Sequence, residues 1–296
     1  MTPTARGHAA MLLFSVLVAG SFSLGSLAAN EISPAALNAM RFVIAAIVVG
    51  AVALLTTGLP RSAMTAPWRY LVLGGFLATY FVLMFEGLKT AQPVSAAAVF
   101  TLTPFISAGV GYLLLRQILT RRMAIALTFG AIGALWVIFK ADFGAFIAFE
   151  VGQGEIIFFI GCVSHAVYTP LIRKLNRGEP PVVFTFFTML GGIGLLVVWA
   201  WSDLWSTGWT SLPAIVWVTI LYVALAASAV TFVLVQYASL RLPSSKVMAY
   251  TYLVPSWVIL WELALGGEAP PALVIVGVVL TVAALVMLLK DQSSSS

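Results

Sequence analysis

The feature that most constrains this chain is a series of apolar runs, each about 20 residues long, separated by short breaks rich in glycine, proline or charge. An α-helix needs about 20 apolar residues to cross a bilayer. The strands of a membrane β-barrel would be shorter and alternating, whereas these runs are unbroken. The sequence predicts an all-α polytopic membrane protein with ten transmembrane helices, at about residues 7–29, 35–56, 68–88, 94–115, 122–139, 154–172, 182–201, 212–239, 245–265 and 272–289.

Charge and cysteine content exclude several classes of protein. Only 8% of the residues are charged, against about 25% in soluble domains, so a separate water-exposed domain is not expected. Cys162 is the only cysteine and the histidines are His8 and His165, too few for a metal cluster. We expect no cofactor and no metal. The net charge of +5 does not indicate nucleic-acid binding, because the positions of the basic residues explain it.

The basic residues alternate between loops in the manner of a membrane protein. With the N-terminus in the cytoplasm, Lys89 and Lys140 fall on the far side and Arg41 inside the second helix. The other basic residues collect on the cytoplasmic side, as the positive-inside rule requires: Arg6, Arg61, Arg69, Arg116, Arg121, Arg122, Arg173, Lys174, Arg177, Arg241, Lys246 and Lys290. This pattern predicts that both termini are cytoplasmic and that the basic loops lie beside anionic lipid headgroups.

The chain also contains an internal repeat. Sliding residues 81–140 onto 232–291 without a gap places Phe81-Val82-Leu83 on Phe232-Val233-Leu234, and the mid-helix Pro104 on Pro255. Each half then has five helices, and an odd number means that the halves enter the membrane in opposite directions. Inverted repeats of this kind are typical of secondary transporters, whose substrate site lies near the midplane between the repeats.

On these motifs each half resembles an EamA domain of the drug/metabolite transporter superfamily. The resemblance rests on Ser33-Pro34 followed by Arg41 in the second helix, on Pro104 and Pro255, and on the Gly267-Glu268 turn. The first half departs from the pattern at that turn, where it has Arg116-Gln117. Within the superfamily the chain is most similar to bacterial aromatic amino-acid exporters of the YddG type.

The resemblance implies a fold and a function. The fold would be two inverted five-helix repeats around a central cavity, with residues 1–140 and 141–292 as the repeats and the serine run 293–296 as an appended tail. The function would be export of amino acids, aromatic ones above all, and of flat organic cations, across the cell inner membrane. The partners would be a small-molecule substrate and the lipid bilayer; the oligomeric state is left open, and a monomer is compatible with the sequence.

Residues of the helices expected to line the cavity are the candidates for substrate binding. Aromatic faces with a few polar groups suit a planar, amphipathic ligand, although such residues also pack between helices and anchor interfaces. The candidates are Tyr80, Met84, Phe100, Thr101, His165, Tyr168, Gln236, Tyr237, Tyr250, Tyr252, Ser256 and Trp257. Pro104 and Pro255 should free the carbonyls of Phe100 and Thr251 from their helical partners, so these prolines are candidate hinges.

Ionisable residues within the spans are the remaining candidates, because charge at bilayer depth is costly unless it is paired or hydrated. Arg41 and Glu86 are interpreted either as a structural ion pair or interfacial anchors, or as a gate or carboxylate site. The first helix contains no acidic residue, so we expect uncoupled or weakly coupled transport. Another metabolite, such as a small polar amino acid or a sugar, is the alternative substrate.

A different class of protein, a channel or a membrane enzyme, is the second alternative. An enzyme needs a convergent nucleophile–base set or metal ligands, and the sequence offers neither HExxH nor GxSxG. A channel would require a repeated filter or rings of charge.

Overall fold

The computed structural model describes residues 2–144 and 151–290; Glu150 and the serine run 293–296 lie outside them. The described part is helical, and its elements are α1 (Pro3–Ala28), α2 (Pro34–Thr56), η1 (Arg61–Met64), α3 (Trp68–Gly87), α4 (Pro93–Phe100), α5 (Thr103–Leu115), α6 (Arg121–Ile138), α8 (Gln153–Leu175), α9 (Pro181–Trp199), α10 (Trp201–Ser206), α11 (Ala214–Ala224), η2 (Leu225–Val230), α12 (Thr231–Ser239), α13 (Ser244–Ala249), η3 (Tyr250–Leu253), α14 (Val254–Ala264) and α15 (Ala272–Lys290). They form ten helical spans long and apolar enough to cross a membrane, which confirms the predicted fold class.

Local sequence explains where the helices begin. α2, α4 and α9 start at Pro34, Pro93 and Pro181, and proline is favoured at the first helical position because its missing N–H would be unpaired there anyway. α6 starts after Thr120, whose Oγ1 accepts a hydrogen bond from the N–H of Met123 at 3.1 Å. These breaks keep the loops short, so that consecutive spans lie antiparallel.

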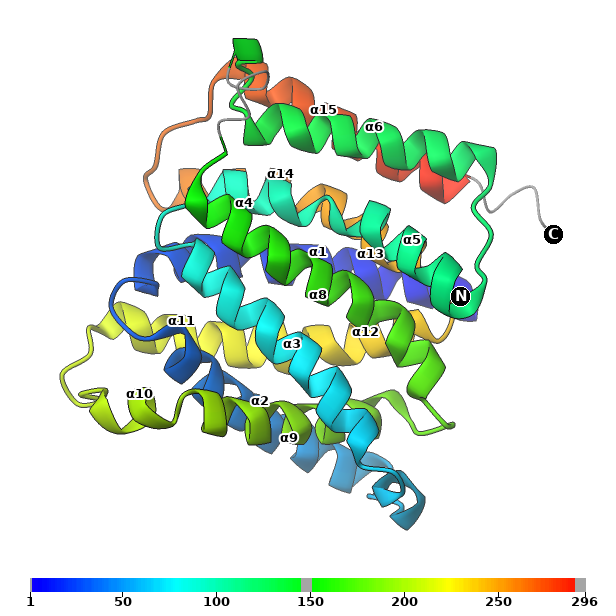
Figure 1. Cartoon of the computed structure of the whole chain (residues 1–296), viewed down its shortest axis with the longest axis vertical. Coiled ribbons are helices and arrows are strands. Elements are labelled where there is room, and N and C mark those ends of the chain that lie inside the picture. Colours follow the sequence, from blue (N-terminus) through cyan, green and yellow to red (C-terminus); the bar gives the residue numbers. More distant parts are fainter. Residues whose placement is uncertain (1, 145–150, 291–296) are drawn as a thin grey trace.

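The two halves pack in mutually equivalent ways. α6 lies against α15, the last span of each half, and the pair forms one edge of the bundle, while α2 and α9 form the opposite edge (Figure 1). α8 packs on α3 and α5 of the first half. In the same manner α1 packs on α11, α12 and α14 of the second half. Each contact therefore has a counterpart when the halves are exchanged, as an inverted repeat requires.

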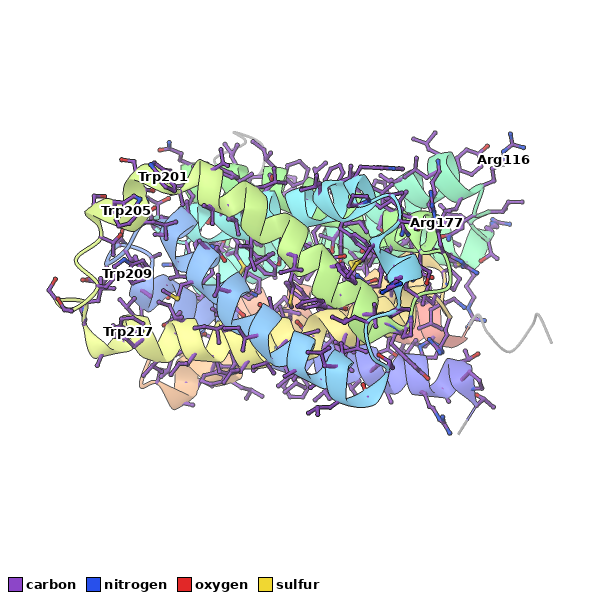
Figure 2. The ribbon with its side chains drawn as sticks, turned by 90° about the horizontal axis from the view of Figure 1, so that it is seen from below. Arg116, Arg177, Trp201, Trp205, Trp209 and Trp217 are labelled. Atoms are coloured by element: carbon purple, nitrogen blue, oxygen red, sulfur yellow. The ribbon has the colours of Figure 1, made fainter. Side chains whose placement is uncertain are left out.

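The two ends of the bundle differ in chemistry. Arg116 and Arg177 lie at one end, where α1 begins and α15 ends, and we call this the basic end (Figures 1 and 2). The opposite end carries Trp201, Trp205 and Trp209, and we call it the tryptophan end (Figure 2). Tryptophan is enriched at the membrane–water interface, so we interpret these side chains as an interfacial belt.

A buried ion pair ties the first half to the second at the basic end. Arg69 is 1% exposed, and its Nη2 lies 2.7 Å from Oε1 of Glu179 in the loop between α8 and α9. The backbone N–H of Arg177 donates to Oε2 of the same carboxylate at 2.6 Å. Burial raises the pKa of Glu179, but the hydrogen bonds from Arg69 and Arg177 outweigh it and hold that pKa below its ordinary value.

Glycines allow α3 and α9 to cross at close range. A Cβ on Gly74 would lie 2.2 Å from the backbone N of Gly192, and a Cβ on Gly191 would lie 2.3 Å from the backbone O of Tyr70. Small residues at an interface let the backbones of two membrane helices approach each other closely, and these glycines do so for α3 and α9.

Both predicted proline breaks occur. The fourth span is divided into α4 and α5 just before Pro104, and the ninth contains the 3₁₀ turn η3 before Pro255. The carbonyl of Phe100 accepts from Oγ1 of Thr103 at 2.7 Å, and the carbonyl of Thr251 accepts from a backbone N–H three residues later. The freed carbonyls are therefore satisfied by the protein. The two breaks also meet, since Oγ1 of Thr103 lies 3.4 Å from Oγ1 of Thr251.

Candidate functional site

A small cavity lies at the centre of the bundle, between the two halves. Its volume is about 10 Å³, which holds no more than about one water molecule. It is enclosed by residues of α1, α3, α8, η2 and α12, among them Tyr80, Phe81, His165, Tyr168 and Phe232. The centre is thus occluded, and a ligand of amino-acid size has to widen it.

Aromatic rings form the wall of this central pocket. The ring of Tyr80 stacks on Phe100 with centroids 5.6 Å apart, and its centroid lies 4.5 Å from that of His165. Phe158 contacts Tyr80 at 5.8 Å and Phe22 of α1 at 5.8 Å. These residues come from α1, α3, α4 and α8, so the cluster joins both halves. Such faces provide stacking and cation–π contacts for a planar ligand.

Several polar atoms of this cluster have no hydrogen-bond partner among the described residues. They are Oη of Tyr80, Nδ1 of His165 and Oε1 of Gln236, all buried. The amide Nε2 of Gln236 donates to Oη of Tyr168 at 3.0 Å. A buried polar atom without a partner is costly, so these atoms are the ones that a bound ligand or water would satisfy.

Arg41 lies directly behind this wall. Its side chain is fully buried, and its guanidinium sits 3.5 Å from the ring centroid of Phe81. Nε donates to Oγ of Ser228 at 2.5 Å, Nη2 to the carbonyl of Ala227 at 2.7 Å and Nη1 to Oδ1 of Asn38 at 3.4 Å. Ser228 and Ala227 belong to η2, a single π-helical stretch in the eighth span. π-Bulges of this kind occur frequently at functional sites.

The structure separates Arg41 from Glu86, and the interpretation as a mutual ion pair is wrong. Glu86 lies near the end of α3, where its carboxylate pairs with Lys89 at 2.8 Å. That side chain is 41% exposed, so it can reach interfacial water. Arg41 takes part in neither of the ion pairs found among the described residues.

The predicted substrate-binding residues divide into two groups. Tyr80, Phe100, His165, Tyr168 and Gln236 come together at the central pocket. The others lie around or outside it. Met84 is buried, and Ser256 is half-buried. The hydroxyl of Thr101 donates to the carbonyl of Ala98. Oη of Tyr250 lies 3.0 Å from Nδ1 of His8, and the indole N–H of Trp257 donates to Oγ of Ser15 at 3.2 Å.

Two of the predicted residues do not face the central pocket. The guanidinium of Arg241 lies 3.6 Å above the ring of Tyr237, and the residues that line the pocket do not include this tyrosine. Tyr252 packs against Gly130 of α6, where a Cβ would lie 2.3 Å from the tyrosine ring. The reason at Tyr252 is the 3₁₀ turn, which has three residues per turn and so directs its side chain elsewhere than a continuous α-helix would.

Sequence reasoning missed residues that the repeat could have indicated. Phe81 and Phe232 stack face to face, with centroids 5.5 Å apart and planes 15° apart, and Phe42 contacts both rings edge-on. Phe81 and Phe232 occupy equivalent positions in the two halves. Equivalent residues that touch must lie close to the two-fold axis relating the halves, so this stack marks that axis.

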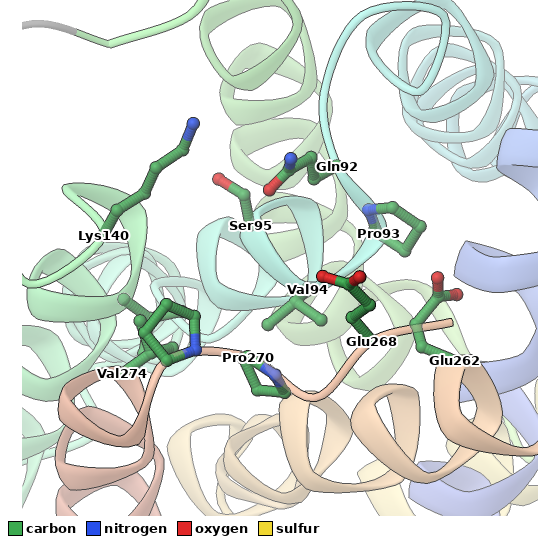
Figure 3. Close-up of a pocket in the computed structure, with 11 residues that line it drawn as sticks. Gln92, Pro93, Val94, Ser95, Lys140, Glu262, Glu268, Pro270 and Val274 are labelled. Atoms are coloured by element: carbon green, nitrogen blue, oxygen red, sulfur yellow. The ribbon is translucent and has the colours of Figure 1, made fainter. Parts of the chain in front are cut away.

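A larger pocket opens at the tryptophan end of the bundle. Its volume is about 450 Å³, and it lies between the start of α4, the ends of α6 and α14, and the start of α15. Figure 3 shows Lys140, Gln92 and Ser95 on one side and Glu262 and Glu268 on the other. We call it the mouth pocket. Polar side chains at the mouth contrast with the aromatic centre.

A family model and a curated relative both identify proteins similar to this chain as transporters. The family model of the EamA-like transporter family matches residues 5–139 and 152–290, one match in each half. A curated relative, the uncharacterized transporter YyaM of Bacillus subtilis (strain 168), is 27% identical over 263 residues, which are 86% of this chain and 85% of that protein. A crystal structure at 21% identity superposes with a TM-score of 0.71 over 99% of both chains, a likeness that concerns the fold.

Proposed function

Because the chain belongs to the EamA-like transporter family, and so is a multi-pass membrane transporter rather than an enzyme, we propose that it exports amino acids with a preference for aromatic ones. The observation that carries this proposal is the central aromatic cluster, whose buried polar atoms have no partner among the described residues. Stacked rings would receive a planar side chain, and the polar atoms would receive the charged end of the substrate.

Transport would follow alternating access, with the two halves rocking about the central pocket. The pocket is occluded, while the mouth pocket stands open at the tryptophan end. Pro104 and Pro255 would act as hinges, since each interrupts a span and the two interruptions meet at the centre. Helix breaks that approach each other in this way can bend together.

We further propose that transport is uncoupled or weakly coupled. Acidic side chains within the membrane carry the coupled proton in many transporters. No acidic residue lines the central pocket in the part of the chain that the structure describes. In the cell inner membrane the basic end would face the cytoplasm, because Lys and Arg favour the cytoplasmic side.

The proposal is tested with purified protein in liposomes. Labelled tryptophan, phenylalanine, threonine and alanine are offered with and without a proton gradient. Selective movement of the aromatic pair, independent of the gradient, supports the proposal. Preference for threonine or alanine favours the alternative, a small polar metabolite. Movement only with a gradient contradicts the absence of coupling.

A conservative variant links the activity to the central pocket. Tyr80→Phe removes only the unpartnered hydroxyl, and Tyr112→Phe removes the hydroxyl of a tyrosine that is 57% exposed on α5. If Oη of Tyr80 contacts substrate, its loss should lower the apparent affinity by a few-fold, as expected for one hydrogen bond. Tyr112→Phe should transport like the original protein. Equal behaviour of the two variants would remove Tyr80 from the site.

A further inference from the structure

Arg41 is a buried cation for which the described part of the protein provides no counter-ion. The acceptors of its hydrogen bonds are an amide oxygen, a hydroxyl and a backbone carbonyl, all neutral. A guanidinium has five N–H donors, and these bonds use three of them. Arg69, the other fully buried arginine, has its charge balanced by Glu179 at 2.7 Å. A buried charge without an opposite charge is costly, so the cost at Arg41 requires an explanation.

The second half has an equivalent arrangement of helices without an arginine at the corresponding place. The repeat carries its shape-determining features in both halves, including the prolines, the central phenylalanines and the close α6–α15 contact. The seventh span, α9, corresponds to α2, yet it contains no charged residue at all. The equivalent surface of α9 is built from glycines that pack on α3 and on Phe42. A charge present in one half alone points to a role other than packing.

Arg41 also borders the central pocket. Phe81, which lies under the guanidinium, and Ala227, whose carbonyl accepts from it, both line that pocket. The pocket is too small for an amino acid, so binding has to move part of its wall. Moving the Phe81 ring off Arg41 would enlarge the pocket and expose the guanidinium to it in the same step.

We propose that Arg41 is the binding site for the carboxylate of the substrate. This inference rests on the proposed function and narrows its substrate class to molecules that carry a carboxylate. An arginine–carboxylate pair is charge-assisted and often bidentate, and its hydrogen bonds are about twice as strong as neutral ones. The carboxylate therefore replaces the neutral acceptors Ser228 and Ala227 and supplies the missing negative charge. The aromatic ring of the substrate then lies among Tyr80, Phe100 and Phe158.

The site excludes one class of ligand that the family resemblance had suggested. A flat organic cation without a carboxylate would add a second positive charge beside Arg41 in a low-dielectric interior, where like charges repel strongly. Amines that have the shape of an amino acid but lack its carboxylate should therefore bind poorly.

Binding at Arg41 would also alter the eighth span. In the present structure the guanidinium holds η2 through Ser228 and Ala227. When a carboxylate takes over these donors, the π-helical stretch loses its cross-link to α2. Substrate binding would thus loosen a contact between the two halves at the centre of the bundle.

The test uses matched pairs of an amino acid and its decarboxylated amine as competitors. Tryptophan is paired with tryptamine and leucine with isoamylamine, in liposomes, and inhibition of labelled amino-acid exchange is measured. In the original protein each amino acid should compete at least about tenfold better than its amine, the effect expected of a hydrogen-bonded charge pair. Arg41→Gln should bring the ratio close to one. Arg69→Gln removes the other buried arginine and should leave the ratio unchanged.

The outcomes separate this inference from the proposed function. If tryptamine competes as well as tryptophan, the aromatic site stands and the Arg41 site is overturned. If only leucine binds, and binds better than isoamylamine, the carboxylate site stands and the aromatic preference is wrong. If Arg41→Gln retains the preference for amino acids, the inference is overturned. If none of the four compounds competes, both proposals are refuted.

A measurement on the original protein covers the case in which Arg41→Gln does not fold. Phenylglyoxal modifies accessible guanidinium groups, and modification of Arg41 can be followed by mass spectrometry. Tryptophan should slow the modification of Arg41, whereas tryptamine should not. Equal protection by both compounds would overturn the inference. Complete absence of modification would also overturn it, because a guanidinium that never becomes accessible cannot meet a substrate.

Discussion

Replacing Gly74 with alanine should force α3 and α9 apart. A Cβ at this position would lie 2.2 Å from the backbone N of Gly192 and 2.6 Å from the backbone O of Thr188. Both neighbours are backbone atoms in the middle of a helix, so neither can turn aside as a side chain would. Ordinary contact begins near 3.4 Å, and the helices must therefore separate by about 1 Å at the crossing.

The energetic effect follows from two opposing contributions. Overpacking of a well-packed contact costs about 1–3 kcal/mol, whereas alanine is favoured over glycine within a helix by about 1 kcal/mol. Gly194, on α9, has open space around the position of a Cβ, so Gly194→Ala receives the second contribution without the first. The difference in free energy of unfolding between the two variants isolates the clash and should be about 1–3 kcal/mol.

The assay is thermal unfolding in detergent micelles, with unfolding followed by circular dichroism. Soluble domains of 150–250 residues lose about 2–4 °C in Tm per kcal/mol, so Gly74→Ala should unfold several degrees below Gly194→Ala. Gly194→Ala should match or exceed the original protein. Equal stability of the two variants would refute the reasoning, because it would mean that α3 and α9 do not cross as closely as described.

Two further predictions concern Glu179 and the orientation of the protein in the membrane. The folded-state pKa of the Glu179 carboxylate lies below its ordinary value of 4.5. This carboxylate therefore stabilises the protein above that pH, and the effect is lost as the pH falls through the lower folded-state pKa. Glu179→Gln should flatten the acid side of a plot of stability against pH, and an unchanged plot would contradict the assignment. Cys162 is buried, so a cysteine introduced at exposed Arg177 or Trp205 should be the main site of labelling by a membrane-impermeant maleimide. In intact cells Trp205→Cys should react and Arg177→Cys should react only after permeabilisation; the reverse result would invert the proposed orientation.

The ten spans could be predicted because bilayer thickness fixes the length of an apolar run, and breaks such as Ser33-Pro34 end each run sharply. The proline interruptions followed in the same way, since Pro104 and Pro255 lack the N–H that a continuous helix needs. The spans and the proline interruptions depend on residues close together in the chain, so the sequence alone is enough to predict them.

The orientation of individual side chains could not be predicted from the sequence. In a helix that is apolar on all sides, a tyrosine facing the centre and one facing a neighbouring helix have similar surroundings in the sequence. Tyr80 and Tyr252 illustrate this, since one lies in the central cluster and the other packs against Gly130. The π-helical stretch that accepts hydrogen bonds from Arg41 could not be predicted from the sequence either, because Leu225–Val230 has the composition of an ordinary apolar helix.

Because the two halves are equivalent, the present conformation predicts a second one, in which the halves exchange their conformations. At the basic end α5 and α13 are joined by the N–H of Ser244, which donates to Oε1 of Gln117 at 3.2 Å, while at the tryptophan end α4 and α14 border the mouth pocket. If each half adopts the present shape of the other, these roles are exchanged. The contact between Gln117 and Ser244 then becomes an entrance, and the walls of the mouth pocket become a seal. Cysteines at Gln117 and Ser244, joined by a short bifunctional maleimide, should therefore hold the protein in its present shape and leave half of the transport cycle inaccessible.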